Sequence, residues 1–133
     1  METFNVMKKS LVITFASIIL ACGAETLAAI VFIPAFTATW PDANDIEHRV
    51  NIQSDDEGKE SGIIFGDEQH DSDSDKRGDL SGSFNGLNIE FTVERPTGDI
   101  KFIGKMIPVS NEDHNITRIE LNSSEGKLIL SAE

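Results

Sequence analysis

The sequence has little of what catalytic and metal sites are usually built from. Its single cysteine excludes an intramolecular disulfide, so side-chain packing has to stabilise the fold. The three histidines, His48, His70 and His114, are scattered and lack the paired spacing that places two imidazoles on one metal ion. No serine lies in a G-x-S-x-G motif. The sequence therefore predicts a protein that is not an enzyme.

Basic residues are also scarce, because 11 Lys and Arg stand against 23 Asp and Glu, for a formal net charge of -12. Most of the excess lies in the first half of the chain, where residues 42–79 carry 13 acidic and 4 basic side chains. Residues 80–133 carry 8 acidic and 5 basic side chains. A surface of this sign repels phosphate backbones, and no basic or aromatic stripe interrupts it. Nucleic acid is therefore excluded as a partner.

Long hydrophobic runs occur only near the N-terminus. Lys8 and Lys9 precede an apolar stretch over residues 11–20, and small residues follow around Cys22. A basic segment, a short hydrophobic stretch and small residues at its end are the parts of an export signal. The sequence therefore predicts export to the cell envelope.

The end of this segment, SIILAC over residues 17–22, resembles the lipobox of bacterial lipoproteins. The resemblance covers residues 7–22. It implies that residues 1–22 comprise a signal peptide and its lipobox cysteine, that this Cys22 is the lipidation site, and that the acylated Cys22 becomes the mature N-terminus after cleavage. The membrane is then a partner through the lipid. The rest of the chain is not identified as a member of a family.

Three other outcomes remain open for the N-terminus. Ordinary signal peptidase cleavage after Ala24 is one, because Cys22 and Ala24 are both small. A second apolar run over residues 27–36 allows an uncleaved membrane anchor, residues 11–36, with roughly 20 apolar positions. Glu25 would then lie near the bilayer centre, at a cost on the order of 3 kcal/mol. The last outcome is a chain that is not exported.

Residues 23–43 are expected to form an apolar segment and tether, and residues 44–133 a β-domain. From residue 44 on, apolar and polar residues alternate between clusters of turn residues, which is typical of strands with one buried face. Asn85-Gly86 lies between two such runs and predicts a hairpin with a type I′ turn, in which both residues have positive φ. Six or seven short strands without a helical period predict an all-β fold, a small antiparallel meander that forms a barrel or a sandwich.

The same alternation predicts which side chains form the core. One early strand is predicted to bury Ile46, His48, Val50 and Ile52 on one face. The positions expected to supply most of the core are Phe84, Leu87, Ile89, Phe91, Val93, Ile100, Phe102, Ile119, Leu121, Leu128 and Leu130.

An acidic segment, residues 66–79, is predicted to be a solvated loop that includes His70. Carboxylates at alternate positions offer the oxygen ligands that Ca²⁺ prefers, so a weak calcium site is the one cofactor hypothesis that the residues support. The candidate metal ligands are Asp71, Asp73, Asp75 and Asp79. The segment is not a complete EF-hand loop, because Lys76 stands where that loop needs glycine.

These observations predict a small, lipid-anchored β-domain of the cell envelope with a binding or structural role. Two alternatives stay open. One is a calcium-dependent interaction module that uses the acidic loop over residues 67–79, and the other is a membrane-anchored accessory protein that keeps its N-terminal segment. The sequence does not identify a ligand or a protein partner.

Overall fold

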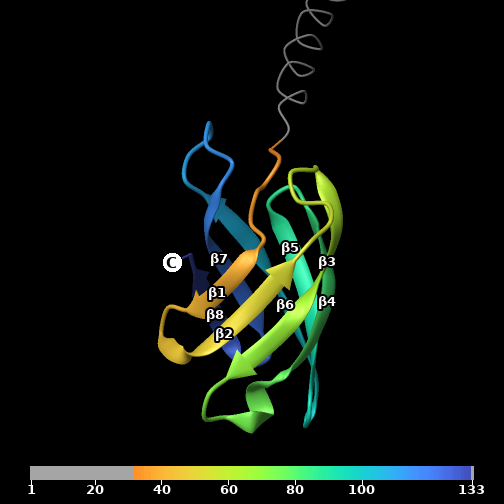
Figure 1. Cartoon of the computed structure of the whole chain (residues 1–133), viewed down its shortest axis with the longest axis vertical. Coiled ribbons are helices and arrows are strands. Elements are labelled where there is room, and N and C mark those ends of the chain that lie inside the picture. Colours follow the sequence, from red (N-terminus) through yellow and green to blue (C-terminus); the bar gives the residue numbers. More distant parts are fainter. Residues whose placement is uncertain (1–31, 133) are drawn as a thin grey trace, which may run out of the picture. The chain divides into compact units, whose positions relative to one another are not determined.

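The computed structural model describes residues 32–132, in which eight antiparallel strands follow one another around a closed barrel (Figure 1). A single turn of 3-10 helix, η1 (Ser74–Lys76), separates the third strand from the fourth. The strands are β1 (Ala38–Asp42), β2 (Asp45–Gln53), β3 (Ser61–His70), β4 (Gly78–Asn85), β5 (Asn88–Arg95), β6 (Gly98–Pro108), β7 (Ile116–Ser123) and β8 (Gly126–Ser131). The predicted all-β meander is confirmed, and it closes as a barrel. Within the described residues, no helix has the length and apolar character that crossing a membrane requires.

Two predicted boundaries differ from the structure. Strand β1 lies inside residues 23–43, which were expected to form a tether, and its Trp40 is buried in the core together with Phe36. The barrel therefore begins before residue 44. The acidic segment 66–79 is not one loop either, because its first five residues complete β3 and its last two begin β4.

Because the strands run up and down in chain order, their connections alternate between the two ends of the barrel. We call one end the η1 end; it carries η1 and the connections at residues 43–44, 71–77, 96–97 and 124–125 (Figure 1). The opposite end carries the remaining connections and residues 32–37, which lead into β1. We call it the entry end.

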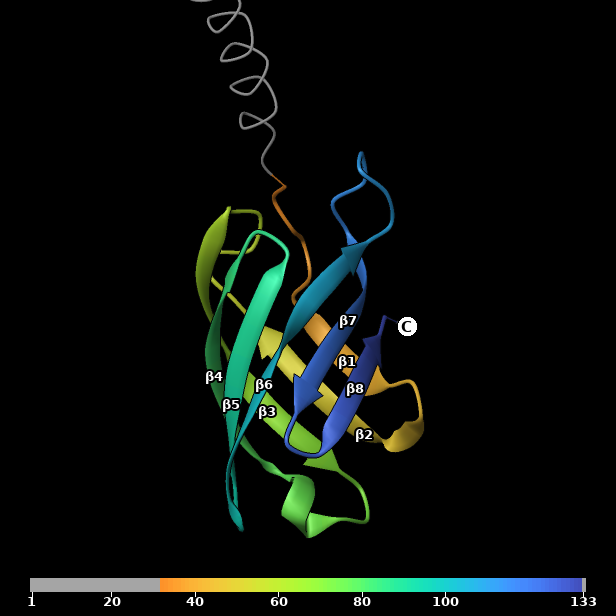
Figure 2. The ribbon, with the colours of Figure 1, turned by 180° about the vertical axis from the view of Figure 1, so that it is seen from behind.

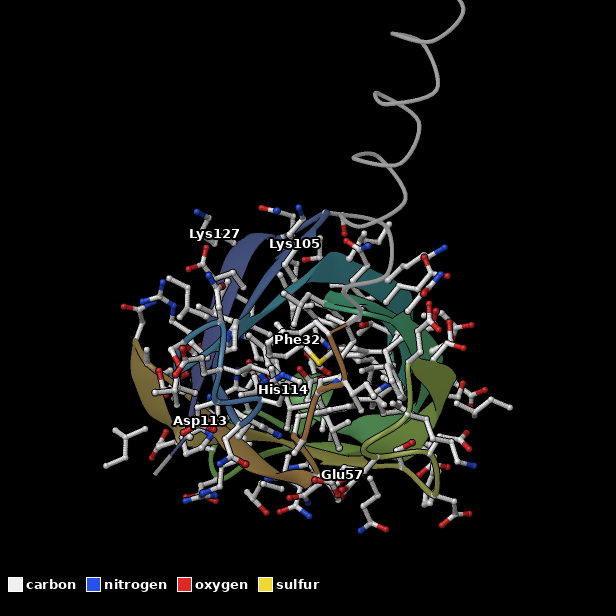
Figure 3. The ribbon with its side chains drawn as sticks, turned by 90° about the horizontal axis from the view of Figure 1, so that it is seen from above. Phe32, Glu57, Lys105, Asp113, His114 and Lys127 are labelled. Carbon is white, nitrogen blue, oxygen red and sulfur yellow. The ribbon has the colours of Figure 1, made fainter. Side chains whose placement is uncertain are left out.

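The barrel closes between its first and last strands (Figure 2). The register there pairs Asp42 with Leu130, and Ala43 N–H donates a hydrogen bond to the Ile129 carbonyl at 2.9 Å. Nearer the entry end, Ala35 forms a parallel bridge with the residue before β7, Asn115. Phe32 packs on His114 there, with ring centroids 4.2 Å apart (Figure 3). Residues 32–37 thus extend the barrel wall beyond the short β8.

The barrel interior is filled by apolar side chains. Of the eleven positions predicted to supply most of the core, ten are buried and Leu87 is partly buried. The predicted burial of His48, Val50 and Ile52 on β2 is confirmed. The core also contains residues that neither prediction named: Phe36, Trp40, Ile64, Leu80, Met106 and Ile116. The prediction for Ile46 is wrong, because its side chain is 84% exposed at the start of β2.

The hairpin predicted at Asn85-Gly86 is present between β4 and β5, but its turn is not type I′. The register pairs Asn85 with Asn88, so Gly86 and Leu87 are the two central residues. Gly86 has φ 57°, and no described residue other than glycine has positive φ. Positive φ at the first central position alone is the requirement of a type II′ turn.

Candidate functional site

Five charged or titratable side chains form a connected group at the η1 end, and we call them the ionic network: Asp42, His48, Glu68, Arg95 and Glu125. At its centre is Glu68, whose side chain has 0% exposure. Arg95 donates from Nε to Glu68 Oε1 at 2.7 Å and from Nη2 to Oε2 at 2.8 Å. His48 Nε2 lies 2.7 Å from the same Oε2. One buried carboxylate therefore has a bidentate arginine and a histidine as partners.

The two outer members of the network are carboxylates nearer to solvent. Asp42 Oδ2 lies 3.4 Å from His48 Nδ1, and Glu125 Oε1 accepts from Arg95 Nη1 at 2.7 Å. Both His48 ring nitrogens thus face carboxylate oxygens, an arrangement that favours the doubly protonated imidazolium. Carboxylates and cationic groups therefore alternate along the network, in the order Asp42, His48, Glu68, Arg95 and Glu125.

Strand register brings these side chains together. Glu68 on β3 lies opposite Gly78 on β4, and a Cβ at Gly78 would lie 2.0 Å from the Glu94 carbonyl oxygen on β5. Gly78 therefore lets the backbones of β4 and β5 approach closely, and the Arg95 side chain reaches the Glu68 carboxylate across β4. The Arg95 guanidinium carbon also lies 5.8 Å from the centroid of the Phe102 ring, so the network rests directly on the apolar core.

The pKa values in the network follow from this pairing. Burial raises the pKa of Glu68, but the hydrogen bonds and positive charges of His48 and Arg95 outweigh it and lower that pKa to about 2. Burial lowers the pKa of His48, but Glu68 and then Asp42 raise it by more, so the net shift is upward from 6.5. Each partner therefore keeps the other charged, as expected for a buried ion pair with good geometry.

A second pair lies beside the network. His70 on β3 is buried, not solvated as predicted, and its ring centroid is 5.7 Å from that of His48. Its Nε2 lies 2.8 Å from Asp45 Oδ2. The backbone N–H groups of Ser72 and Asp73 point at its Nδ1, at 3.2 and 3.0 Å. Because Nδ1 accepts two hydrogen bonds, the ring proton sits on Nε2 and is donated to Asp45.

Asp45, Glu47 and His70 are the three residues of the described chain whose donor atoms are close enough to share a metal ion. The hydrogen bonds of His70 argue against this use. A histidine that binds a metal through one ring nitrogen normally donates a hydrogen bond from the other nitrogen. If a metal bound Nε2 of His70, its Nδ1 would have to be that donor, but Nδ1 faces two backbone N–H donors. Asp45, Glu47 and His70 are therefore better explained as a hydrogen-bonded group than as a metal site.

A small cavity of about 100 Å³ opens beside the ionic network. Its charged lining consists of Asp42, His48, Lys76, Arg95, Glu125 and Lys127. Phe102 and Leu128 add apolar surface. Buried charged groups therefore meet an open space here.

The four predicted metal ligands do not converge. Asp71 accepts from both Arg49 terminal nitrogens, at 3.0 and 3.2 Å, and Asp73 accepts from the backbone N–H of Asp75 at the start of η1, at 3.0 Å. Asp79 is on β4, opposite Asp67 and Glu94. None of the predicted ligands belongs to the one group in residues 32–132 with metal-binding spacing. The predicted lipidation site, Cys22, lies outside the described residues.

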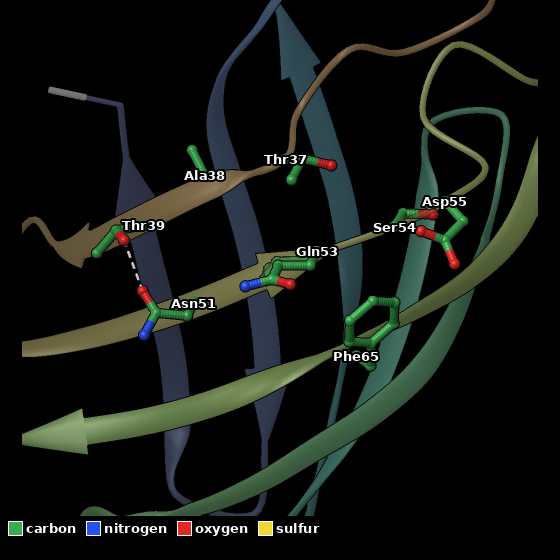
Figure 4. A pocket seen from close by; sticks show the side chains of 9 residues that line it. Thr37, Ala38, Thr39, Asn51, Gln53, Ser54, Asp55 and Phe65 are labelled. Atoms are coloured by element: carbon green, nitrogen blue, oxygen red, sulfur yellow. Dashed lines mark hydrogen bonds between the residues drawn. The ribbon is translucent and has the colours of Figure 1, made fainter.

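A wider groove of about 320 Å³ runs along the outer face of β1–β3 (Figure 4). Two of its polar side chains are hydrogen-bonded to each other, since Thr39 donates to Asn51 at 2.6 Å, and Asn51 in turn donates to Asp67 on β3 at 2.7 Å. Phe65 forms one wall with 42% of its surface exposed. The groove contains no buried charged side chain, so its chemistry is that of an ordinary outer sheet surface.

Sequence reasoning placed His48 on a buried face but missed the roles of Glu68 and Arg95. A usable signal was present, since the alternation that buries Ile64 continues through Gly66 to Glu68 and His70. The acidic composition of the segment concealed it, because charged residues are rarely buried unless they are paired.

In comparisons with protein-family models, characterised proteins and solved structures, no match was found. The role of the η1 end therefore has to be inferred from its own chemistry.

Proposed function

We propose that this chain is an exported protein of the cell envelope, held at the membrane through Cys22, and that its barrel acts by binding or by structural contact and not by catalysis. The N-terminal pattern that is typical of an export signal and the resemblance of residues 17–22 to a lipobox support the location. The observation that carries the role of the barrel is the paired ionic network. Its buried charged groups are already neutralised by one another over a filled core.

This arrangement supports a rigid scaffold because charge pairs on a packed core hold the ends of several strands in one geometry. Glu68, His48 and Arg95 come from β3, β2 and β5. A general acid or base needs a group whose proton is available to a substrate. Here His48 has carboxylates at both ring nitrogens, so the geometry favours a structural use of its proton.

The location is tested by expressing the full chain in a bacterial host and determining the mass of its mature N-terminus. We expect an acylated Cys22 at the first position, and loss of acylation in Cys22→Ser. Thr26→Ser, a small change just beyond the site, should be processed as the wild type. A mature chain that begins at Glu25 would indicate secretion without a lipid. A chain that begins at Met1 or Met7 and carries no acyl group would contradict the lipid anchor and favour a retained membrane segment.

A further inference from the structure

The cavity at the η1 end has an unusual charge for this protein. Acidic residues outnumber basic ones by 23 to 11 in the chain, yet Lys76, Arg95 and Lys127 all line this cavity of about 100 Å³. Among residues 32–132, Lys76 and Lys127 form no ion pair with a carboxylate. Because Arg95 is already paired with Glu68 and Glu125, the positive charge that can attract an anion is that of the two lysines without acidic partners.

The carboxylate now bound to the outer side of Arg95 is replaceable. Glu68 uses Nε and Nη2 of Arg95 and is fully buried, whereas Glu125 uses only Nη1 and its side chain is 53% exposed. Glu125 belongs to the two-residue connection between β7 and β8, which are paired at Ser123 and Gly126. Rotation of an exposed side chain at such a turn frees Nη1 without moving a strand. Glu125 therefore holds the place that another carboxylate would take.

We propose that this cavity binds the carboxylate of a small organic acid, which replaces Glu125 on Arg95 Nη1 while Lys76 and Lys127 neutralise it at the mouth. The site goes beyond the function proposed above and requires neither export nor a lipid.

The size and lining of the cavity define the class of ligand. Its volume of about 100 Å³ equals the share of roughly three water molecules in the liquid, which suits an acid with few carbon atoms. Phe102 and Leu128 provide an apolar wall for a short alkyl group, and Arg95 provides a charge-assisted hydrogen bond to the carboxylate. Asp42, which also lines the cavity, lies on its His48 side.

Acetate is the probe for the first test, titrated into the full-length protein at constant ionic strength with sodium chloride as the balancing salt. The readout is the NMR signal of Arg95 Nε–H, a buried group beside the site. We expect saturable binding in the millimolar range. Glu125→Gln should bind acetate roughly five- to tenfold more tightly, because the competing intramolecular carboxylate is gone. Glu120→Gln makes the same charge change on β7, away from the cavity lining, and should match the wild type.

A lysine pair gives the second test and remains informative if Glu125→Gln fails to fold. Lys127→Ala should weaken acetate binding several-fold, while Lys105→Ala, an exposed lysine outside the cavity lining, should leave it unchanged. Equal affinities in the wild type, Glu125→Gln and Lys127→Ala would overturn the proposal. So would a response of the Arg95 signal that sodium chloride reproduces. Neither result depends on how the N-terminus is processed. The proposal of a lipid anchor and the proposal of a carboxylate-binding cavity can therefore be contradicted separately.

Discussion

At the scale of single residues, Glu68 is the one buried carboxylate among residues 32–132, and its burial carries a large electrostatic cost. A carboxylate with 0% exposure loses its hydration, and the penalty for one buried ion is still several kcal/mol after relaxation. Arg95 and His48 offset that penalty through three short contacts. The carboxylate is therefore stable only as part of the group.

The first prediction follows from this dependence. Arg95→Met should lower the free energy of unfolding by about 3 to 5 kcal/mol, because it leaves Glu68 buried with His48 as its remaining cationic partner. Urea denaturation at neutral pH measures the change. Arg118→Met is the matched control, since its ion pair with Glu120 is solvent-exposed and should contribute no more than about 1 kcal/mol.

A second variant separates pairing from packing. The double mutant Arg95→Met with Glu68→Leu removes both the arginine and the buried carboxylate that it neutralises. Much of the stability lost in the single mutant should therefore return. A single mutant as stable as Arg118→Met would show that Glu68 does not depend on Arg95.

The second prediction concerns pH and His48. Its pKa is raised in the folded state above the ordinary 6.5, so the protonated form stabilises the fold. That contribution is fully present below pH 6.5 and is lost as the pH rises through the raised pKa. The urea midpoint of the wild type should therefore fall as the pH rises from 6.5 through that raised pKa, and that of His48→Gln should fall less. Equal pH profiles for the two proteins would contradict this assignment.

At the scale of strands, β5 and β6 show how alternation builds the core. Phe91 and Phe102 are register partners, and their rings stack with centroids 5.1 Å apart. On the other side of β5, Gly82 is the partner of Phe91, and a Cβ at Gly82 would lie 2.6 Å from the Phe91 Cβ. The missing side chain on β4 lets the two backbones approach closely and makes room for the phenylalanine.

The third prediction tests this packing. Phe91→Ala should lower the free energy of unfolding by about 3 to 5 kcal/mol, because the cavity left under Phe102 cannot collapse in a closed barrel. Thermal and urea denaturation both report it. Thr92→Ala, the next residue on the outer face, should change the stability by far less. Similar losses in the two variants would mean that the assigned inward face is wrong.

The sequence predicted β4 to β8 better than β1 to β3, for physical reasons. In β5, the apolar residues that face inward alternate with polar ones, so the pattern identifies the strand. In β3, the inward positions after Ile64 are held by Gly66, Glu68 and His70, which a pattern based on apolar residues assigns to a loop. The pairing of Glu68 with Arg95 joins residues 27 positions apart, and no local pattern contains it.

At the scale of the whole barrel, the negative charge is unevenly distributed around the wall. Residues 42–79, with 13 acidic and 4 basic side chains, include β2, β3 and η1, while the later strands are closer to neutral. Much of the first group is exposed and self-repelling. Added salt should therefore act on this side of the barrel by screening, with a Debye length of about 10 Å at 0.1 M.

The last prediction uses that expectation to test the calcium hypothesis. Asp71 is held by Arg49 and Asp73 caps η1, so a calcium ion would have to displace bonds that already order residues 71–77. We expect calcium to raise the thermal midpoint of the full chain no more than magnesium or sodium chloride does at equal ionic strength. Asp71→Ala with Asp73→Ala should leave that response unchanged. The matched control, Asp99→Ala with Glu112→Ala, removes two exposed carboxylates elsewhere. A saturable rise that is specific to calcium, and that only the first double mutant abolishes, would show instead that these carboxylates rearrange to bind the ion.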